Sequence, residues 1–342
     1  MIPITIIYAI LIFVVLILVH EAGHFLAAKA CGVQVNEFAF GLGPAIFKKK
    51  IGETVYAIRA LPFGGQCVME GEDEGSDNPR AFPNAARWKR FIILAAGVFM
   101  NFLLGLIVLI CLIAPQQEYV TTKIDYVMDK FTGGDAIQPG DRIVSIDGRK
   151  ILLSSDIATA MNAGDDYDYD FVIERDGERI ELQNLHVEPQ PYEENGETVY
   201  YYGFRYKVEE LSFFEVLRQS WYSAVNMVRI VFDTFAMLFR GQVGFNDLSG
   251  PIGIVAVMSD VAQQSMYSFW YLSAFIAINL AVMNLLPIPA LDGGRIFFLL
   301  IEAVTRRKIN EKFEGILNAA MLILLLGLMV AVAVKDIVSL VG

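Results

Sequence analysis

Two histidines and a glutamate near the N-terminus have the spacing of a metal centre. The sequence there reads His20-Glu21-x-x-His24. On a helix, positions i and i+4 share one face, so both imidazoles can bind one metal ion. Glu21 would stand beside that ion, where it can take a proton from the attacking water. The chain has only three histidines, so this motif predicts a zinc site with Glu21 as catalytic base.

A hydrolytic zinc site needs a third protein ligand. The remaining histidine, His186, lies in a polar stretch in the middle of the chain, and we expect it to be an ordinary surface residue. Asp292 is the best candidate, because it follows Pro287 and Pro289 and precedes two glycines. These residues interrupt a helix, and interrupted backbone at membrane depth is tolerated where it lines a cavity. The alternative is a helix-ending loop at the membrane surface.

Apolar segments surround these residues. Apolar residues make up 55% of the chain and charged residues only 19%, and the apolar residues are clustered. Ile2–Val19 is uncharged and about as long as a membrane-crossing helix, and we interpret it as a retained helix rather than a signal peptide. Four spans are predicted, near residues 4–30, 91–114, 269–286 and 316–334. The stretch 209–262 predicts one or two amphipathic helices on the membrane surface, with a fifth crossing less favoured.

Charge predicts the orientation. Basic residues collect between the first and second spans and between the third and fourth, which places both loops in the cytoplasm. Residues 115–264 carry 12 Lys and Arg against 25 Asp and Glu, so this portion and the N-terminus are expected outside. The predicted surroundings of the spans are the lipid bilayer. Nothing in this acidic portion suggests nucleic-acid binding.

The two motifs together resemble the site-2 protease family of intramembrane metalloproteases, most closely its regulator-of-sigma-E protease branch. The resemblance rests on His20-Glu21-x-x-His24 and on Asn284-x-x-Pro-x-Pro-x-Leu-Asp292-Gly. It covers essentially the whole chain, and it implies a location in the bacterial cell (inner) membrane. It implies that His20, His24 and Asp292 bind Zn²⁺, that Glu21 is the catalytic base, and that Asn284 holds the substrate or an oxyanion.

Two further segments resemble family elements. Gly97-x-x-x-Asn101 matches a G-x-x-x-N element, although such spacing is more often helix packing for Gly97. Residues 33–68 are rich in β-formers and glycines and resemble a membrane-re-entrant β-loop, with a cytoplasmic hairpin as the alternative. An open strand edge could hold an unwound substrate beside the zinc. Asn101 and Gly64 are therefore expected to bind substrate.

The middle of the chain resembles a PDZ domain. Residues 138–148 predict a turn, a strand and an Asp-Gly hairpin turn, and residues 171–182 predict two strands joined by a second Asp-Gly turn. Two interpretations stay open: a peptide-binding groove, or a rigid cap without a ligand. The segment 247–254 also matches the family, with a role that the residues do not define.

The expected fold is a polytopic α-helical membrane protein with about four transmembrane helices, a re-entrant β-loop and an inserted extracytoplasmic α+β PDZ domain. The expected divisions are a catalytic half (1–114), the PDZ domain (115–208), the amphipathic region (209–262) and the last two spans (263–342). The predicted function is cleavage of single-span transmembrane proteins, such as a membrane-tethered anti-sigma factor or remnant signal peptides. The alternative is a catalytically silent zinc-binding scaffold or transporter. Glu21 argues against this alternative, because a transporter needs no base.

Overall fold

The computed structural model describes residues 2–341 except 73–75, 165, 195–196, 243, 245–248 and 308–309. The chain divides into two compact units, one formed by residues 1–109 and 227–342 and the other by residues 110–226. Asp247 and Leu248, the first two residues of the segment 247–254, lie outside the described residues. The domain limits inferred from the sequence stay predictions.

Among the described residues, five helices are long and apolar enough to cross a membrane. They are α1 (Ile2–Cys31), α2 (Arg87–Ile113), α4 (Phe213–Phe239), α6 (Met266–Leu285) and α8 (Glu311–Val341). Four fall on the four predicted spans, so the chain is a multi-pass membrane protein, as predicted. The fifth, α4, is one continuous helix in the stretch that we expected to lie on the membrane surface. The number of crossings stays a prediction.

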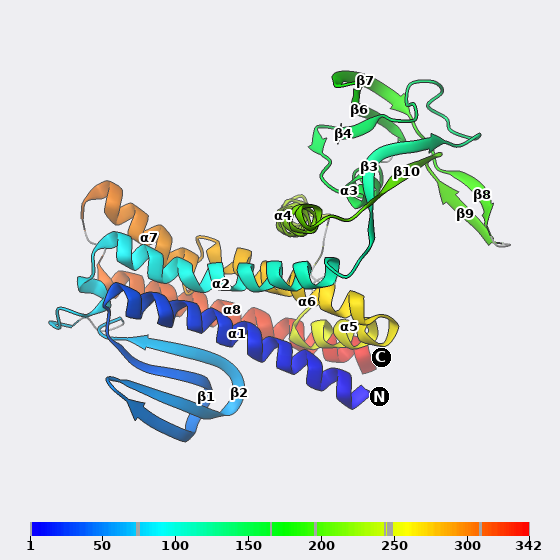
Figure 1. The fold of residues 1–342 in the computed structure, drawn as a ribbon. Helices are drawn as coiled ribbons and strands as arrows, with labels where there is room; N and C mark the ends of the chain where they lie inside the picture. Colours follow the sequence, from blue (N-terminus) through cyan, green and yellow to red (C-terminus); the bar gives the residue numbers. More distant parts are fainter. Residues whose placement is uncertain are drawn as a thin grey trace. The chain divides into compact units, whose positions relative to one another are not determined.

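The unit formed by residues 1–109 and 227–342 is called the membrane unit below. Two shorter helices complete it, α5 (Pro251–Gln264) and α7 (Asp292–Thr305). Ser265 separates α5 from α6, because its backbone is extended (φ −158°) and its side-chain oxygen accepts a hydrogen bond from the Ser268 amide. In Figure 1 the axes of α1, α2, α6 and α8 are roughly aligned with one another. A 3₁₀ turn, η1 (Phe82–Asn84), precedes α2.

The predicted β-rich segment forms two long antiparallel strands, β1 (Val35–Ile51) and β2 (Thr54–Met69). Phe38 is paired with both Cys67 and Tyr56, so the first half of β1 lies between the two halves of β2. Gly64, with φ at +83°, stands just before the second half of β2. A Cβ atom added to Gly65 would lie 2.9 Å from Cγ of Glu21. The second half of β2 therefore runs directly beside α1.

The second unit is built around a six-stranded antiparallel sheet. Its strands are β3 (Glu118–Val127), β4 (Arg142–Ile146), β5 (Arg149–Lys150), β6 (Asp168–Arg175), β7 (Glu178–His186) and β10 (Phe204–Glu210), in the order β10-β3-β4-β6-β7 with β5 paired to β4. The helix α3 (Ser154–Met161) and a separate hairpin of β8 (Gln190–Glu194) and β9 (Glu197–Tyr201) complete it. Ile124, Ile143 and Phe171 are at the centre of its core.

Both predicted Asp-Gly turns are confirmed. Asp147 and Gly148 join β4 to β5, and Asp176 and Gly177 join β6 to β7. All four residues have positive φ values, between 49° and 85°, as a type I′ turn requires. The sheet and its helix agree with an α+β domain, and the specific assignment as a PDZ domain stays a prediction.

Candidate metal centre

The helix α1 carries the first two candidate metal-ligand side chains. His20 and His24 are one turn apart, and their rings meet edge to face with centroids 4.8 Å apart. They share a face because the spacing of four residues matches the helical repeat. The helix is uncharged from Ile2 to Val19, so these groups stand at the end of an apolar stretch. Ionisable side chains at such a depth are costly and are usually functional.

The third side chain, Asp292, is brought in by the break between α6 and α7. Helix α6 stops at Leu285, Ala290 has a positive φ of 72°, and Asp292 is the first residue of α7. The two following glycines allow this tight path: a Cβ atom on Gly293 would collide with the Leu286 carbonyl oxygen, and one on Gly294 with the Ile288 carbonyl oxygen. The Pro- and Gly-rich sequence thus places the carboxylate opposite α1.

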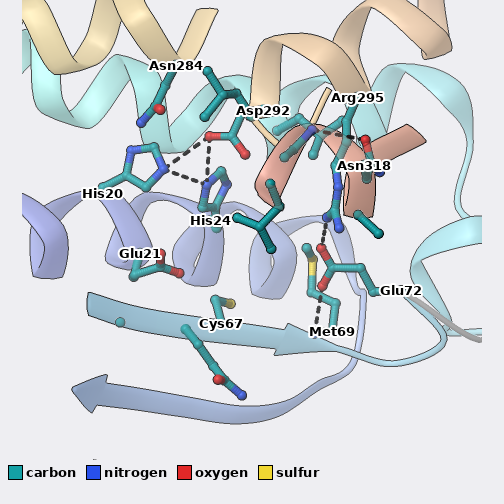
Figure 2. Close-up of a pocket in the computed structure, with 17 residues that line it drawn as sticks. His20, Glu21, His24, Cys67, Met69, Glu72, Asn284, Asp292, Arg295 and Asn318 are labelled. Carbon is teal, nitrogen blue, oxygen red and sulfur yellow. Dashed lines mark hydrogen bonds and ion pairs between the residues drawn. The ribbon is translucent and has the colours of Figure 1, made fainter. Parts of the chain in front are cut away.

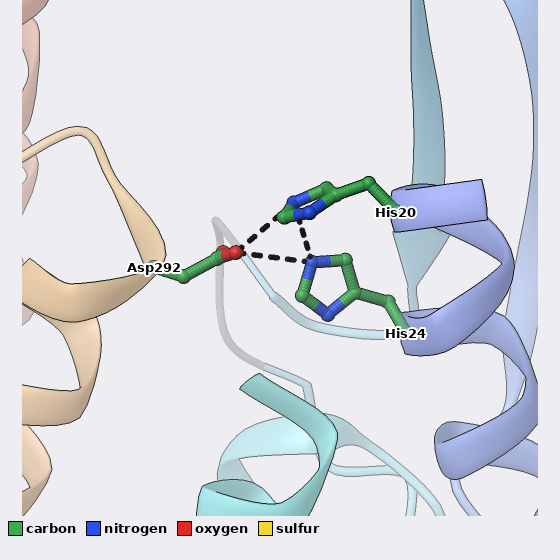
Figure 3. Close-up of side chains that lie close together, drawn as sticks. All are labelled: His20, His24 and Asp292. Carbon is green, nitrogen blue, oxygen red and sulfur yellow. Dashed lines mark hydrogen bonds and ion pairs between the residues drawn. The ribbon is translucent and has the colours of Figure 1, made fainter. Parts of the chain in front are cut away.

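Three lone-pair atoms converge at this point (Figure 3). Oδ2 of Asp292 lies 3.1 Å from Nε2 of His20 and 3.2 Å from Nε2 of His24, and the two Nε2 atoms are 3.2 Å apart. Ligand distances of about 2.0–2.1 Å at tetrahedral angles would separate neighbouring ligand atoms by about 3.3 Å. Among the described residues, this is the one cluster of at least three His, Cys, Asp or Glu that fits a metal ion.

The polar environment of the cluster also fits a cation. Nδ1 of His24 lies 2.8 Å from the Ile93 carbonyl oxygen, so Nδ1 carries the proton and Nε2 presents a lone pair. Oδ2 of Asp292 is buried and has no hydrogen-bond donor among the described residues. Buried acceptors that face one another without donors are unfavourable unless a cation joins them.

Helix α2 approaches the centre closely because it has a glycine there. A Cβ atom on Gly97 would collide with Nε2 of His24 and come within 2.9 Å of Cε1 of His20. On the facing helix, a Cβ atom on Gly23 would lie 2.5 Å from the Ala96 carbonyl oxygen. Gly97 therefore does more than pack helices, since any side chain at this position would fill the metal site.

A cavity of about 450 Å³ opens at the cluster (Figure 2). Glu21 lines it together with the three ligand candidates. Asn284, from the end of α6, lies beside His20 and Asp292, and the second half of β2 forms another wall through Gly65, Gln66 and Cys67. The arrangement brings a candidate metal site, a neighbouring carboxylate and a strand to one open cavity.

The other predicted site residues lie elsewhere. Asn101 is fully buried on α2 behind His20, and it does not line the cavity. Gly64 does not line it either, whereas its neighbour Gly65 does. His186 belongs to the other unit, where its Nδ1 lies 2.7 Å from a carboxylate oxygen of Asp168.

Sequence reasoning missed a polar group at the far side of the cavity. Arg295, one turn after Asp292, forms an ion pair with Glu72, which also accepts a hydrogen bond from the Met69 amide. Oδ1 of Asn318 on α8 accepts a hydrogen bond from the Ala290 amide, which helps hold the loop before Asp292. Arg295 could have been suspected from its place after Asp-Gly-Gly. Glu72 and Asn318 have no comparable sequence signal.

A three-ligand metal cluster with an adjacent glutamate, on helices that could cross a membrane, defines the class of membrane metalloproteases. The chain belongs to peptidase family M50, the site-2 protease family, whose model matches residues 8–328. A Clostridium perfringens protein named "Putative zinc metalloprotease CPE1693" is 36% identical over 337 residues, covering 97% of this chain and 98% of the relative.

Other relatives carry the same kind of name. One from Fusobacterium nucleatum is 36% identical over 97% of this chain, and one from Staphylococcus aureus is 29% identical over 98% of it. These matches confirm the family resemblance, and with it zinc as the cofactor.

Proposed function

We propose that this protein is an intramembrane zinc endopeptidase that hydrolyses peptide bonds within transmembrane segments of single-span membrane proteins. One observation carries the proposal. His20 and His24 lie inside the candidate span formed by residues 6–31, and the cavity beside them is lined by residues of four such helices, α1, α2, α6 and α8. A peptide bond that reaches this cavity is one that can come from within the bilayer.

The residues have distinct proposed roles. His20, His24 and Asp292 would hold the zinc ion, which when bound polarises the scissile carbonyl and makes water a stronger nucleophile. Glu21 does not belong to the ligand triangle but lines the same cavity. It takes the proton of the attacking water and passes it to the leaving amine. Asn284 is placed to donate a hydrogen bond from its amide to the substrate carbonyl oxygen.

The β2 strand is proposed to hold the substrate. A transmembrane helix already uses its carbonyl groups in internal hydrogen bonds, so the cut segment must first be unwound. Gln66 and Cys67 stand in β2 at the cavity wall, and their strand pairs on one side with the first half of β1. The edge beside α1 can accept an extended peptide by strand addition. This interpretation places the β1–β2 segment in the membrane as a re-entrant loop.

The decisive test is membrane proteomics in cells that contain either the native enzyme or the Glu21→Gln variant. Transmembrane fragments should accumulate in the variant and disappear with the native enzyme. Purified native enzyme should then cut those fragments inside the apolar segment, as mapped by mass spectrometry. Identical fragment profiles in both strains would contradict proteolysis and favour the scaffold or transporter. Membrane-tethered anti-sigma factors and remnant signal peptides are the two substrate classes to look for.

The proposed location is the bacterial cell (inner) membrane, with the N-terminus and the 110–226 unit outside. The distribution of Lys and Arg supports this orientation. In a variant without its three native cysteines, a cysteine at the exposed position Glu194 should react with an impermeant maleimide in intact cells. A cysteine at the exposed position Lys312, in the first turn of α8, should react only after lysis. The reverse pattern would invert the topology.

A further inference from the structure

Asn101 is in an unusual environment. It is 0% exposed in the middle of α2, and its Nδ2 lies 3.4 Å from Nδ1 of His20. Its Oδ1 is also buried and has no hydrogen-bond donor among the described residues. A buried amide oxygen without a partner is unfavourable, so the position of this side chain calls for a reason.

Rotating the Asn101 amide by 180° gives the buried Oδ1 atom a hydrogen-bond partner. The two ends of an amide are nearly the same size, and their hydrogen bonds decide which end points where. With Oδ1 toward His20, the orphan oxygen accepts a hydrogen bond from Nδ1–H. The proton then sits on Nδ1, and Nε2 of His20 presents its lone pair to Asp292 and His24. With Nδ2 toward Nδ1, the proton of a neutral ring would sit on Nε2, where it blocks metal binding.

The second histidine, His24, also has an oxygen beside its Nδ1, which supports the orientation with Oδ1 of Asn101 toward His20. Nδ1 of His24 lies 2.8 Å from the carbonyl oxygen of Ile93, also on α2. Ile93, Gly97 and Asn101 are spaced four residues apart, so they follow one face of the helix. The two outer residues supply an acceptor behind each imidazole, and the glycine between them leaves room for both rings. One face of α2 thus supports the whole histidine pair.

We propose that Asn101 is a positioning residue of the metal centre. Its side-chain oxygen accepts a hydrogen bond from Nδ1–H of His20, fixes the tautomer and orientation of that ring, and so strengthens zinc binding. This role differs from the contact with substrate that the sequence suggested for Asn101. It rests on the proposed function only in that His20 must be a zinc ligand. Losing such an outer partner typically weakens metal affinity by about 10–100-fold.

The test compares zinc dissociation constants, measured by chelator competition, for the purified full-length protein and three variants. Asn101→Leu removes the acceptor at similar volume and should weaken binding about 10–100-fold. Asn101→Asp keeps an oxygen at the same place and should bind zinc within about threefold of native, since a carboxylate is a common outer partner of a zinc-bound histidine. Asn284→Leu, the matched control at the cavity wall, should keep native affinity and lose proteolysis.

Two results would overturn the proposal: native affinity in Asn101→Leu, or equal weakening in Asn101→Leu and Asn101→Asp. Thermal unfolding of the metal-free variants separates lost positioning from lost folding. If Asn101→Leu does not fold, the native protein still gives an answer. With ¹⁵N-labelled histidine, only three imidazoles contribute signals, and zinc-loaded His20 should show a protonated Nδ1. A metal-bound Nδ1 there would refute the idea. A native protein that binds no zinc would instead contradict the metal centre itself.

Discussion

Two aspartates with buried carboxylate oxygens, one in each unit, show opposite ways of placing a carboxylate inside a protein. Asp141, 1% exposed in the 110–226 unit, accepts hydrogen bonds from the Gln138 amide and from two nitrogens of Arg175, at 2.7–2.8 Å. Hydrogen bonding to Asp141 and the negative charge of this carboxylate raise the pKa of Arg175. Asp292 in the membrane unit meets two imidazole nitrogens instead, and its Oδ2 has no donor among the described residues.

We interpret the difference as one between a carboxylate that holds a fold and a carboxylate that serves a reaction. Asp141 has its partners within the chain, so its charge is compensated whether or not anything binds. Asp292 has partners that also need a cation, so its arrangement is complete only with the metal. Removing the first should cost stability, and removing the second should cost metal and activity. The following experiments test that contrast.

The largest effect is expected for Asp292→Ala. With one of three ligands gone, zinc content should fall from about one ion per chain to nearly none, and proteolysis should be lost. Metal analysis of the purified protein and a cleavage assay measure both. His186→Ala is the matched control and should change neither. Normal zinc content in Asp292→Ala would mean that the third ligand lies elsewhere.

The next effect separates a ligand from a base. Glu21→Gln should keep about one zinc per chain, because the amide leaves the triangle of His20, His24 and Asp292 intact. Its cleavage rate should fall by about 10²–10⁴-fold, the usual contribution of general acid–base catalysis. Zinc content and rate should be measured on the same preparation. Loss of zinc from this variant would show that Glu21 is itself a ligand.

Asp141→Ala tests the other half of the contrast. Removing one partner of a buried ion pair leaves Arg175 and the Gln138 amide without their acceptor and should destabilise this unit by about 3–5 kcal/mol. Hydrogen exchange in β4 and β6 should speed up accordingly. Zinc content should stay native, because Asp141 lies outside the metal cluster. A loss of zinc together with normal exchange would reverse the roles given to the two aspartates.

The smallest effect concerns a third buried carboxylate, Asp336 on α8. Its Oδ2 accepts hydrogen bonds from the amides of Gly250 and Gly253, at 2.9 and 2.8 Å, at the N-terminus of α5. Both glycines permit this approach, since a Cβ atom on either would lie within 3.0 Å of that oxygen. Asp336→Ala should therefore cost about 1 kcal/mol of local stability.

Hydrogen exchange over residues 251–264 measures this cost, and Asp336→Asn, which keeps an acceptor, should show a smaller one. Exchange that is unchanged in both variants would mean that the contact contributes nothing. The same contact gives a structural reason for Gly250 and Gly253, which lie in the described part of the 247–254 segment. That reason could not be found in the sequence, because Asp336 stands more than 80 residues away.

What the sequence determined by itself was local or compositional. The spacing of His20 and His24, the apolar spans and the two Asp-Gly turns depend on residues a few positions apart, where helix and turn geometry is fixed by the chain. The place of Asp292 was inferable because zinc chemistry requires a third ligand and the Pro- and Gly-rich break offered one.

The tertiary structure decided which distant groups meet. Asn101, 81 residues from His20, stands behind the imidazole, and its contact with substrate stays a prediction. Gly65 rather than Gly64 reaches the cavity, because the path of β2 beside α1 sets which residue faces Glu21. Glu72 and Arg295 meet across 223 positions. Contacts of this kind depend on helix and strand packing over the whole chain, and no local pattern in one sequence encodes them.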